Sequence, residues 1–322
     1  MTKSVSDAQP LDSLIVGAGF SGLYMLHKLR GLGFNAKVVE AGSGVGGTWY
    51  WNRYPGARVD IQSLEYSFGF DDALEEEWRW SERYAPQAEL LRYAEHVADR
   101  FDLKRDITFK TRVTAARWDD AAQLWTVETD TGAPTRCRHL ILATGCLSIP
   151  TDVTFPGLET FTGPVYRTSR WPHEGVDFTG KRVGIIGTGS SAIQSIPVIA
   201  EQAAHLTVFQ RTPNYSMPAH NGPIPDEDWD AWVRDRRAYR AASKDTAGGF
   251  QNDGTTTRLI TETPPVEARA ELERRWAWGG FRILGAFADT GVDPVANRMV
   301  HDFVAEKIRE QVKDPAVADR LT

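Results

Sequence analysis

Apolar and polar residues follow one another in a pattern that predicts alternating strands and helices. Leu11–Val16 is a short apolar run, a glycine-rich turn follows it, and Ser21–Leu32 carries apolar residues at helical spacing. Gly33 is expected to end that helix, and Ala36–Val39 to form the next strand. A strand, a turn, a helix and a strand in this order predict two parallel strands joined by a helix.

The same order of elements returns about 170 residues later. It predicts a strand at Lys181–Ile186, a turn at Gly187–Gly189, a helix at Ser191–Gln202 and a strand at Leu206–Phe209. Strands are also expected between the two units, at Thr108–Val113, Trp125–Glu128 and Leu140–Ala143, as an antiparallel excursion that rejoins the first sheet. The chain is therefore predicted to be an α/β protein with two Rossmann-like dinucleotide-binding domains.

Beyond about Pro213 the pattern becomes helical, which predicts a helical insertion after the second unit. Helices are expected at Asp226–Arg240, Val266–Trp278 and Val295–Val312. Gly248, Gly249 and Gly254 predict a flexible loop between these helices. Asp314 and Pro315 are expected to be the N-cap and the first residue of a further helix.

Composition narrows the classes of function. The 322 residues carry a net charge of −6, which argues against a nucleic-acid-binding surface. The two cysteines, Cys137 and Cys146, form neither a disulfide framework nor a CxxC redox motif, and no metal site is expected. Met1–Pro10 lacks a signal-peptide pattern and no apolar run is long enough to span a membrane, so a cytoplasmic protein is expected. Four clustered tryptophans, at 49, 51, 78 and 80, suit either an aromatic core or a pocket for a large flat ligand.

The first fingerprint is Gly17-Ala18-Gly19-Phe20-Ser21-Gly22. Its glycines allow a tight turn, close approach of a pyrophosphate and close packing of helix on strand, and the helix N-terminus favours the negative charge. Glu40 ends the following strand, where an acid is expected to bind a ribose diol. The first site is therefore predicted to hold a dinucleotide without a 2′-phosphate.

The second fingerprint is Gly187-Thr188-Gly189-Ser190-Ser191-Ala192. Its second strand ends in Gln210-Arg211-Thr212, so Arg211 replaces the acid; the alternative is an ordinary surface arginine. A guanidinium binds a 2′-phosphate that a carboxylate would repel, which predicts NADP at this site. Two such sites in one chain suggest a bound flavin reduced by a nicotinamide nucleotide. The chain has no GxSxG elbow and no Walker loop.

Two further segments make the pattern specific: Gly46-Gly47-Thr48-Trp49-Tyr50-Trp51-Asn52-Arg53-Tyr54-Pro55-Gly56-Ala57-Arg58-Val59-Asp60 after the first unit, and Phe161-Thr162-Gly163 through Arg167 to Trp171-Pro172 before the second. With the two fingerprints, in this order, they resemble the type I Baeyer–Villiger monooxygenases, closest to the phenylacetone and steroid monooxygenase branch. The resemblance runs from about Leu14 to the end. It implies tightly bound FAD, NADPH and O₂, and insertion of one oxygen atom beside a ketone carbonyl to give an ester or lactone.

The resemblance also implies roles for individual residues. For FAD it implies Gly17, Gly19, Phe20, Ser21, Gly22, Glu40, Gly47, Thr48, Trp49, Tyr50, Trp51, Asp60, Tyr66, Val113 and Gly145. For NADP it implies Gly187, Thr188, Gly189, Ser190, Ser191, Ala192, Gln194, Arg211 and Thr212, with Arg58, Val59 and Asp60 where the nicotinamide meets the flavin. Asp60 resembles the catalytic carboxylate that orients an arginine. Its alternative reading is an N-cap for a segment starting at Ile61.

The chain departs from the family pattern in two respects. Arg167 stands where the linker motif Phe161, Gly163, Trp171, Pro172 normally has a histidine, which affects domain coupling and rate more than fold. Full-length members also continue further, and their later part supplies the catalytic arginine and closes the FAD domain. We therefore expect the 322-residue chain to oxygenate poorly by itself.

These arguments predict an N-terminal part of the FAD domain at 1–148, a first part of the NADP domain at 149–220, and a helical region of that domain at 221–322. We expect a monomeric enzyme acting on a small ketone and O₂, with no nucleic-acid or membrane partner. Two alternatives remain open: an N- or S-oxygenating flavin monooxygenase, and a shortened nucleotide-binding product without turnover.

Overall fold

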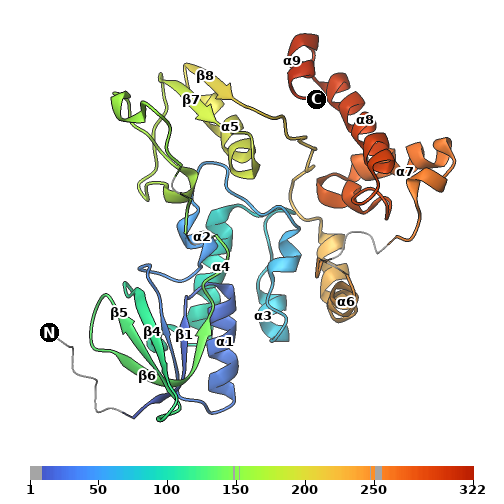
Figure 1. Ribbon diagram of the computed structural model, residues 1–322. Helices are drawn as coiled ribbons and strands as arrows, with labels where there is room; N and C mark the ends of the chain where they lie inside the picture. The colour runs from blue at the N-terminus through green and yellow to red at the C-terminus, as the bar shows by residue number, and fades with distance from the viewer. Residues whose placement is uncertain (1–8, 148, 152, 247, 251–255) are drawn as a thin grey trace. The chain divides into compact units, whose positions relative to one another are not determined.

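The computed structural model describes residues 9–147, 149–151, 153–246, 248–250 and 256–322 (Figure 1). Gly254 and most of Met1–Pro10, on which two predictions rest, lie outside these ranges. The chain divides into two compact units, the first made of residues 1–54 and 87–176 and the second of 55–86 and 177–322. Each unit is made of two separate stretches of the chain. Residues 55–86, which carry Asp60, belong to the second unit because their long-range contacts lie there.

The first unit is built on a six-stranded sheet with the order β3-β2-β1-β6-β5-β4. Its strands are β1 (Leu11–Val16), β2 (Ala36–Val39), β3 (Ile107–Thr108), β4 (Val113–Asp119), β5 (Leu124–Thr129) and β6 (Thr135–Leu142). β1 is parallel to β2 and β6, and β2 is parallel to β3. β5 pairs antiparallel with both β6 and β4, and β4 forms the outer edge of the sheet. The predicted antiparallel excursion that rejoins the sheet is confirmed.

One predicted strand is wrong. Thr108–Val113 is not continuous, because β3 ends at Thr108 and β4 begins at Val113. Lys110 between them has a φ of 53°, a left-handed conformation that a strand does not contain. The two ends of the predicted strand, Thr108 and Val113, therefore belong to two different strands.

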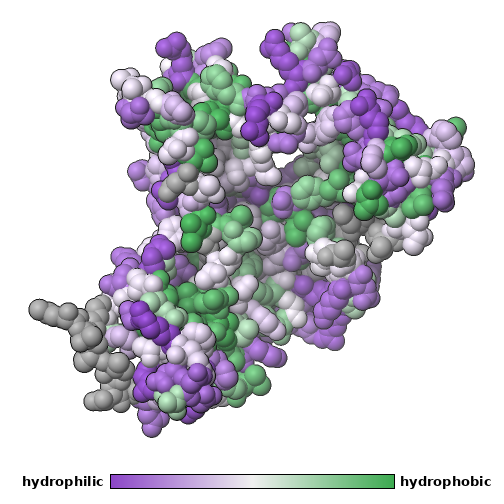
Figure 2. Space-filling model, viewed as in Figure 1, coloured by the Kyte–Doolittle hydropathy of each residue, from purple (hydrophilic) through white to green (hydrophobic). Residues whose placement is uncertain are grey.

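Helices α1 (Phe20–Gly31) and α4 (Gln87–Arg100) pack on one face of this sheet. The shared core includes Ile15 and Val38 of the strands, Leu23 of α1 and Ala94 of α4, all at most 1% exposed. α2 (Thr48–Trp51) and the short 3-10 helices Lys104–Asp106, Leu158–Thr160 and Thr168–Arg170 complete the unit. Figure 2 shows apolar patches among the polar side chains of the visible face.

The second unit contains a two-stranded parallel sheet, β7 (Arg182–Ile186) and β8 (His205–Phe209), joined by α5 (Ser190–Gln202). Its other helices are α3 (Asp72–Glu77), α6 (Asp226–Lys244), α7 (Pro265–Trp278), α8 (Pro294–Gln311) and α9 (Pro315–Arg320), with 3-10 helices Ser63–Tyr66, Ile260–Glu262 and Gly280–Gly285. α7 and α8 share a core that includes Leu272, Val300 and Phe303. The Asp314 carboxylate accepts hydrogen bonds from the N–H groups of Ala316 and Val317, so the predicted N-cap of α9 is confirmed.

The two repeated strand–turn–helix–strand units are both present, and the mixed α/β fold is confirmed. Within the described ranges, the helices are too short or too polar to cross a membrane.

Candidate functional site: two glycine turns at helix N-termini

The first glycine turn joins β1 to α1 and leaves no room for a side chain at Gly17 or Gly22. Gly17 has a φ of 105°, and a Cβ there would lie 2.5 Å from the Ala143 carbonyl oxygen. A Cβ on Gly22 would lie 1.9 Å from the Gly17 carbonyl oxygen. No side chain caps α1, and its first turn carries no acidic residue. The amide groups at this helix start therefore suit an anionic group such as a pyrophosphate.

A second loop of the first unit packs against this turn. The Gly46 N–H donates to the Ala18 carbonyl at 3.0 Å, and a Cβ on Gly47 would lie 2.8 Å from the Gly19 Cα. α2, with Trp49, Tyr50 and Trp51, begins at this contact, and the Tyr50 hydroxyl lies 2.8 Å from Ser43 Oγ. One ligand on the glycine turn would therefore also meet the segment predicted to surround the flavin.

Glu40 lies at the end of β2, as predicted, and is only 6% exposed. Its two carboxylate oxygens accept hydrogen bonds from the N–H groups of Ala18 and Gly42, each at 2.7 Å. Each oxygen keeps a further lone pair for a ribose hydroxyl. Val113 begins β4, and Gly145 follows β6 with a φ of 68°.

The second glycine turn has a similar backbone conformation, but fewer atoms lie close to its glycines. Gly187 has a φ of 98°, and Gly189 is the N-cap of α5, which again has no capping side chain and no acid in its first turn. A Cβ on Gly189 would meet no described atom within 4 Å. Glycine is therefore not required there by packing, which fits close approach of a ligand to the backbone. Ser190, Ser191 and Ala192 form the first turn of the helix.

The two strand–turn–helix–strand repeats have the same hydrogen-bond register, and this register corrects the position predicted for Arg211. The Gly17 N–H donates to the Val39 carbonyl at 2.8 Å, and the Gly187 N–H donates to the Phe209 carbonyl at 2.8 Å. The equivalent of Glu40 is therefore Gln210, and Arg211 lies one residue beyond the acid's place. Arg211 and Thr212 are both exposed. Counting residues from each glycine turn gives the same register, so the sequence contained this signal.

Asp60 is exposed and does not cap a helix. The 3-10 helix that follows it is Ser63–Tyr66, whose N-cap residue is Gln62 and has no capping side chain. Burial, and then the negative charge of Asp60, raise the pKa of Tyr66 to about 12. Asp60 therefore lies close enough to Tyr66 to act on it electrostatically.

Residues 56–59 are fastened to α5 and to the segment before α4. Gln194 Nε2 donates to the Arg58 carbonyl at 3.2 Å, and the Arg58 N–H donates to Gln194 Oε1 at 3.3 Å. A Cβ on Gly56 would lie 2.1 Å from the Gln194 carbonyl oxygen. Val59 is buried, and its N–H donates to the Ala85 carbonyl at 3.1 Å. Gln194 thus has a structural role here, and its part in nucleotide binding stays a prediction.

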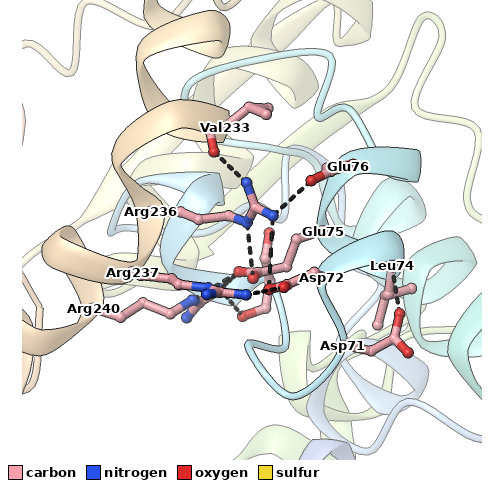
Figure 3. A network of polar contacts seen from close by, with 10 residues as sticks. Asp71, Asp72, Leu74, Glu75, Glu76, Val233, Arg236, Arg237 and Arg240 are labelled. Atoms are coloured by element: carbon pink, nitrogen blue, oxygen red, sulfur yellow. Dashed lines mark hydrogen bonds and ion pairs between the residues drawn. The ribbon is translucent and has the colours of Figure 1, made fainter.

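An ion-pair network between α3 and α6 holds the neighbouring segment (Figure 3). Glu75, with a side chain 2% exposed, pairs with Arg240 and with Arg236. Arg240 Nη2 also donates to the Ser67 carbonyl at 2.7 Å, and the Tyr239 hydroxyl donates to Glu65. The network therefore fixes the end of the 3-10 helix that carries Tyr66.

A small pocket of the second unit, about 20 Å³, has room for roughly one water molecule. Its lining residues are Asp60, Ile61, Gln62, Glu65, Tyr84, Phe250, Phe281 and Arg282. It combines carboxylates, a phenol, a guanidinium and two aromatic rings, which are groups that can orient a small polar ligand.

The linker motif packs within the first unit. Trp171 is 7% exposed, and its ring centroid lies 5.7 Å from that of Tyr166. Arg167 Nη2 donates to the Val153 carbonyl at 3.0 Å, so arginine is accommodated at the histidine position. Phe161 is 62% exposed.

Of the four clustered tryptophans, Trp80 is a core residue whose Nε1 donates to Ser67 Oγ at 2.9 Å.

Sequence reasoning missed the residues that support the second turn. Asn214 Nδ2 donates to the Thr188 carbonyl at 3.2 Å, and Gln210 Nε2 donates to the Arg320 carbonyl at 2.6 Å. No local pattern marks either contact, because the partners lie 26 and 110 residues away in the chain.

Comparison with known proteins agrees with this geometry. The pattern of the pyridine nucleotide-disulphide oxidoreductase family matches residues 14–226. A 2-oxo-Δ(3)-4,5,5-trimethylcyclopentenylacetyl-CoA monooxygenase of Pseudomonas putida is 42% identical over 97% of this chain and 58% of its own length. A phenazine N-monooxygenase of Lysobacter antibioticus is 39% identical over 98% of this chain and 59% of its own. A Baeyer–Villiger monooxygenase of Pseudooceanicola batsensis is 40% identical over 97% and 57%.

A solved structure described as oxidized steroid monooxygenase bound to NADP is 51% identical, with a TM-score of 0.93 over 98% of this chain and 60% of that one. The chain thus spans about three fifths of the length of the relatives it matches. The resemblance to Baeyer–Villiger monooxygenases is confirmed. The chain belongs to the pyridine nucleotide-disulphide oxidoreductase family, and it matches slightly less than three fifths of the length of a Baeyer–Villiger monooxygenase.

Proposed function

We propose that the chain carries the cofactor-binding part of a Baeyer–Villiger monooxygenase. The first unit binds FAD at Gly17–Gly22 and Glu40, and the second binds NADPH at Gly187–Ala192 and Arg211. FAD supplies the redox chemistry that activates O₂, and one oxygen atom is inserted beside a ketone carbonyl to give an ester or lactone. The observation that carries this proposal is the pair of uncapped helix N-termini behind glycine turns, one followed by an acid and the other by Gln210 and Arg211.

The chain's own residues have separable tasks in this proposal. Glu40 holds the ribose of FAD, while α1 and α5 direct amide groups at the two pyrophosphates. Asp60 is proposed as the active-site carboxylate, since it is exposed, caps no helix and lines the pocket with Tyr84 and Arg282. Gly47–Trp51, Arg58, Tyr66, Val113, Gly145, Gln194 and Thr212 remain proposed cofactor contacts.

We also propose a ketone as the class of substrate; the pocket that Phe250 and Phe281 line, about 20 Å³, is too small to hold one in this structure. A cytoplasmic monomer stays a prediction, as do the domain limits 1–148, 149–220 and 221–322. Size-exclusion chromatography with light scattering measures the oligomeric state directly.

The test uses the purified chain and three classes of substrate, which distinguish the candidate reactions. Flavin content is measured first, by absorbance after unfolding. NADPH oxidation is then followed with a cyclic ketone, an aromatic amine and a sulfide, and the products are identified by mass spectrometry. Ester or lactone formation supports the proposal. Oxygenation of the amine alone would support the second candidate, an N-oxygenating enzyme, which the similarity to the phenazine N-monooxygenase favours.

One outcome counts against the proposed cofactor sites. A protein that binds neither FAD nor NADPH lacks the proposed sites. A protein that binds both and oxidises NADPH without an oxygenated product has the proposed sites and lacks efficient oxygenation, which is the result expected of the 322-residue chain. Efficient formation of ester by the 322-residue chain would contradict that expectation of impaired turnover.

A further inference from the structure

The C-terminal end of α9 lies beside the residue that follows β8. Gln210 Nε2 donates to the Arg320 carbonyl at 2.6 Å, and Figure 1 draws the end of the chain near the segment that leaves β8. Gln210 occupies the place that Glu40 has in the first unit. An acid at that place binds the ribose of a dinucleotide, so Arg320 lies where the ribose of the second nucleotide is expected.

Two arginines belong to the segments that meet at this contact. Arg211 directly follows Gln210, and both Arg211 and Arg320 are exposed. In the part of the chain that the structure describes, neither guanidinium takes part in a hydrogen bond or an ion pair. Gln210 is uncharged, so no carboxylate at the acid's place opposes a phosphate.

The acidic residues of α9 are already engaged elsewhere. Asp314 caps the helix, and Asp319 Oδ1 lies 3.4 Å from Arg309 Nε on α8. Arg309 also donates to Thr322 Oγ1 at 2.8 Å. Asp319 is therefore partly neutralised by Arg309, which leaves the charge of Arg320 for a ligand.

We propose that Arg320 binds the 2′-phosphate of NADPH together with Arg211. Two guanidinium groups around one phosphate provide several charge-assisted hydrogen bonds, and Gln210 positions the second group by holding its backbone. The inference rests on the proposed NADPH site and adds to it a residue 109 positions further along the chain, one that determines the preference for NADPH over NADH.

The experiment measures binding of 2′,5′-ADP and of 5′-AMP to the chain by calorimetry at one fixed salt concentration. These probes differ in the 2′-phosphate and require neither flavin nor turnover. Arg320→Gln and Arg211→Gln are each expected to weaken 2′,5′-ADP about tenfold and to leave 5′-AMP unchanged. Arg320→Lys keeps the positive charge but not the paired N–H donors of the guanidinium, and it is expected to lose less affinity for 2′,5′-ADP than Arg320→Gln. Lys313→Gln removes one exposed positive charge before α9 and is the matched control, expected to bind as the parent does.

The outcomes separate the two proposals. If Arg211→Gln weakens 2′,5′-ADP while Arg320→Gln does not, the role of Arg320 is wrong and the NADPH site stands. If Lys313→Gln loses as much affinity for 2′,5′-ADP as Arg320→Gln does, the effect depends only on net charge and the inference is overturned. If the parent chain binds 2′,5′-ADP no better than 5′-AMP, the proposed NADPH site itself is wrong. Circular dichroism of each variant verifies that the fold is kept.

Discussion

Glu75 on α3 and Arg240 on α6 meet in a buried ion pair although 165 residues separate them in the chain. Arg240 Nε donates to Glu75 Oε1 at 2.7 Å, and the Glu75 side chain is 2% exposed. Arg236 approaches the other carboxylate oxygen, so one buried acid faces two guanidinium groups. The pair joins two parts of the second unit that are far apart in sequence.

Removing the charge of Glu75 is expected to destabilise the second unit. Glu75→Gln removes the buried counterion of Arg240, whereas Arg236 keeps its pair with Glu76 at 2.6 Å. Because the Arg240 side chain is 25% exposed, the cost should stay below the roughly 3 kcal/mol of a fully buried pair. Arg237→Gln breaks an exposed pair with Asp72 in the same network and should change stability little. Urea unfolding followed by tryptophan fluorescence compares the two, and equal midpoints would refute the buried role.

Gly22→Ala is expected to abolish FAD binding. Its Cβ would lie 1.9 Å from the Gly17 carbonyl oxygen, so the turn that positions the helix amides has to open. Gly31→Ala, in the same helix, meets nothing within 4 Å and is the matched control. Titration of FAD fluorescence should show at least a tenfold weaker affinity for Gly22→Ala, about 1.4 kcal/mol or more. Similar affinities in both variants would argue against a cofactor at this turn.

Because the pKa of Tyr66 is raised, the second unit is expected to lose stability at high pH. Because folding raises this pKa from 10.0 to about 12, the contribution is fully present below pH 10 and is lost as pH rises towards 12. Tyr66→Phe should remove that part of the loss in stability. The tyrosinate absorbance of the parent minus that of Tyr66→Phe isolates the titration of this one phenol.

Asp60→Asn tests the link between Asp60 and Tyr66. The Asp60 charge is the smaller of the two causes, so the neutral amide should lower the pKa of Tyr66 and leave it above 10.0. Absorbance titrations of Asp60→Asn and Asp60→Asn with Tyr66→Phe supply the difference curve. A curve that superimposes on the parent's would show that the two groups do not interact.

Glu271 on α7 predicts the opposite behaviour in acid. Hydrogen bonds, first from Arg274 and then from Arg275, lower the pKa of its carboxyl from 4.5 to about 2. Its stabilisation is therefore present above pH 4.5 and is lost as pH falls towards 2. Glu271→Gln should be less stable than the parent at pH 7, and the difference should disappear near pH 2. A difference that stays constant over this range, in thermal unfolding monitored by circular dichroism, would contradict the assignment.

The sequence by itself determined the repeated units and most of their elements. Local periodicity and turn glycines are properties of neighbouring residues, so β1, α1, β2, β7, α5 and β8 were predicted within about one residue. The Asp314 cap was predicted for the same reason. The strand predicted at Thr108–Val113 is wrong because Lys110, which has a positive φ, lies between the end of β3 and the start of β4.

Only the tertiary structure decided which distant residues share a site. It assigned residues 55–86, with Asp60, to the unit that contains α5, and it brought Arg320 to the end of β8. It also placed Gln210, and not Arg211, at the position of Glu40. The contact between Glu75 and Arg240 depends on how α3 and α6 pack against each other. Residues paired in this way follow no periodic pattern along the chain, so the sequence does not predict them.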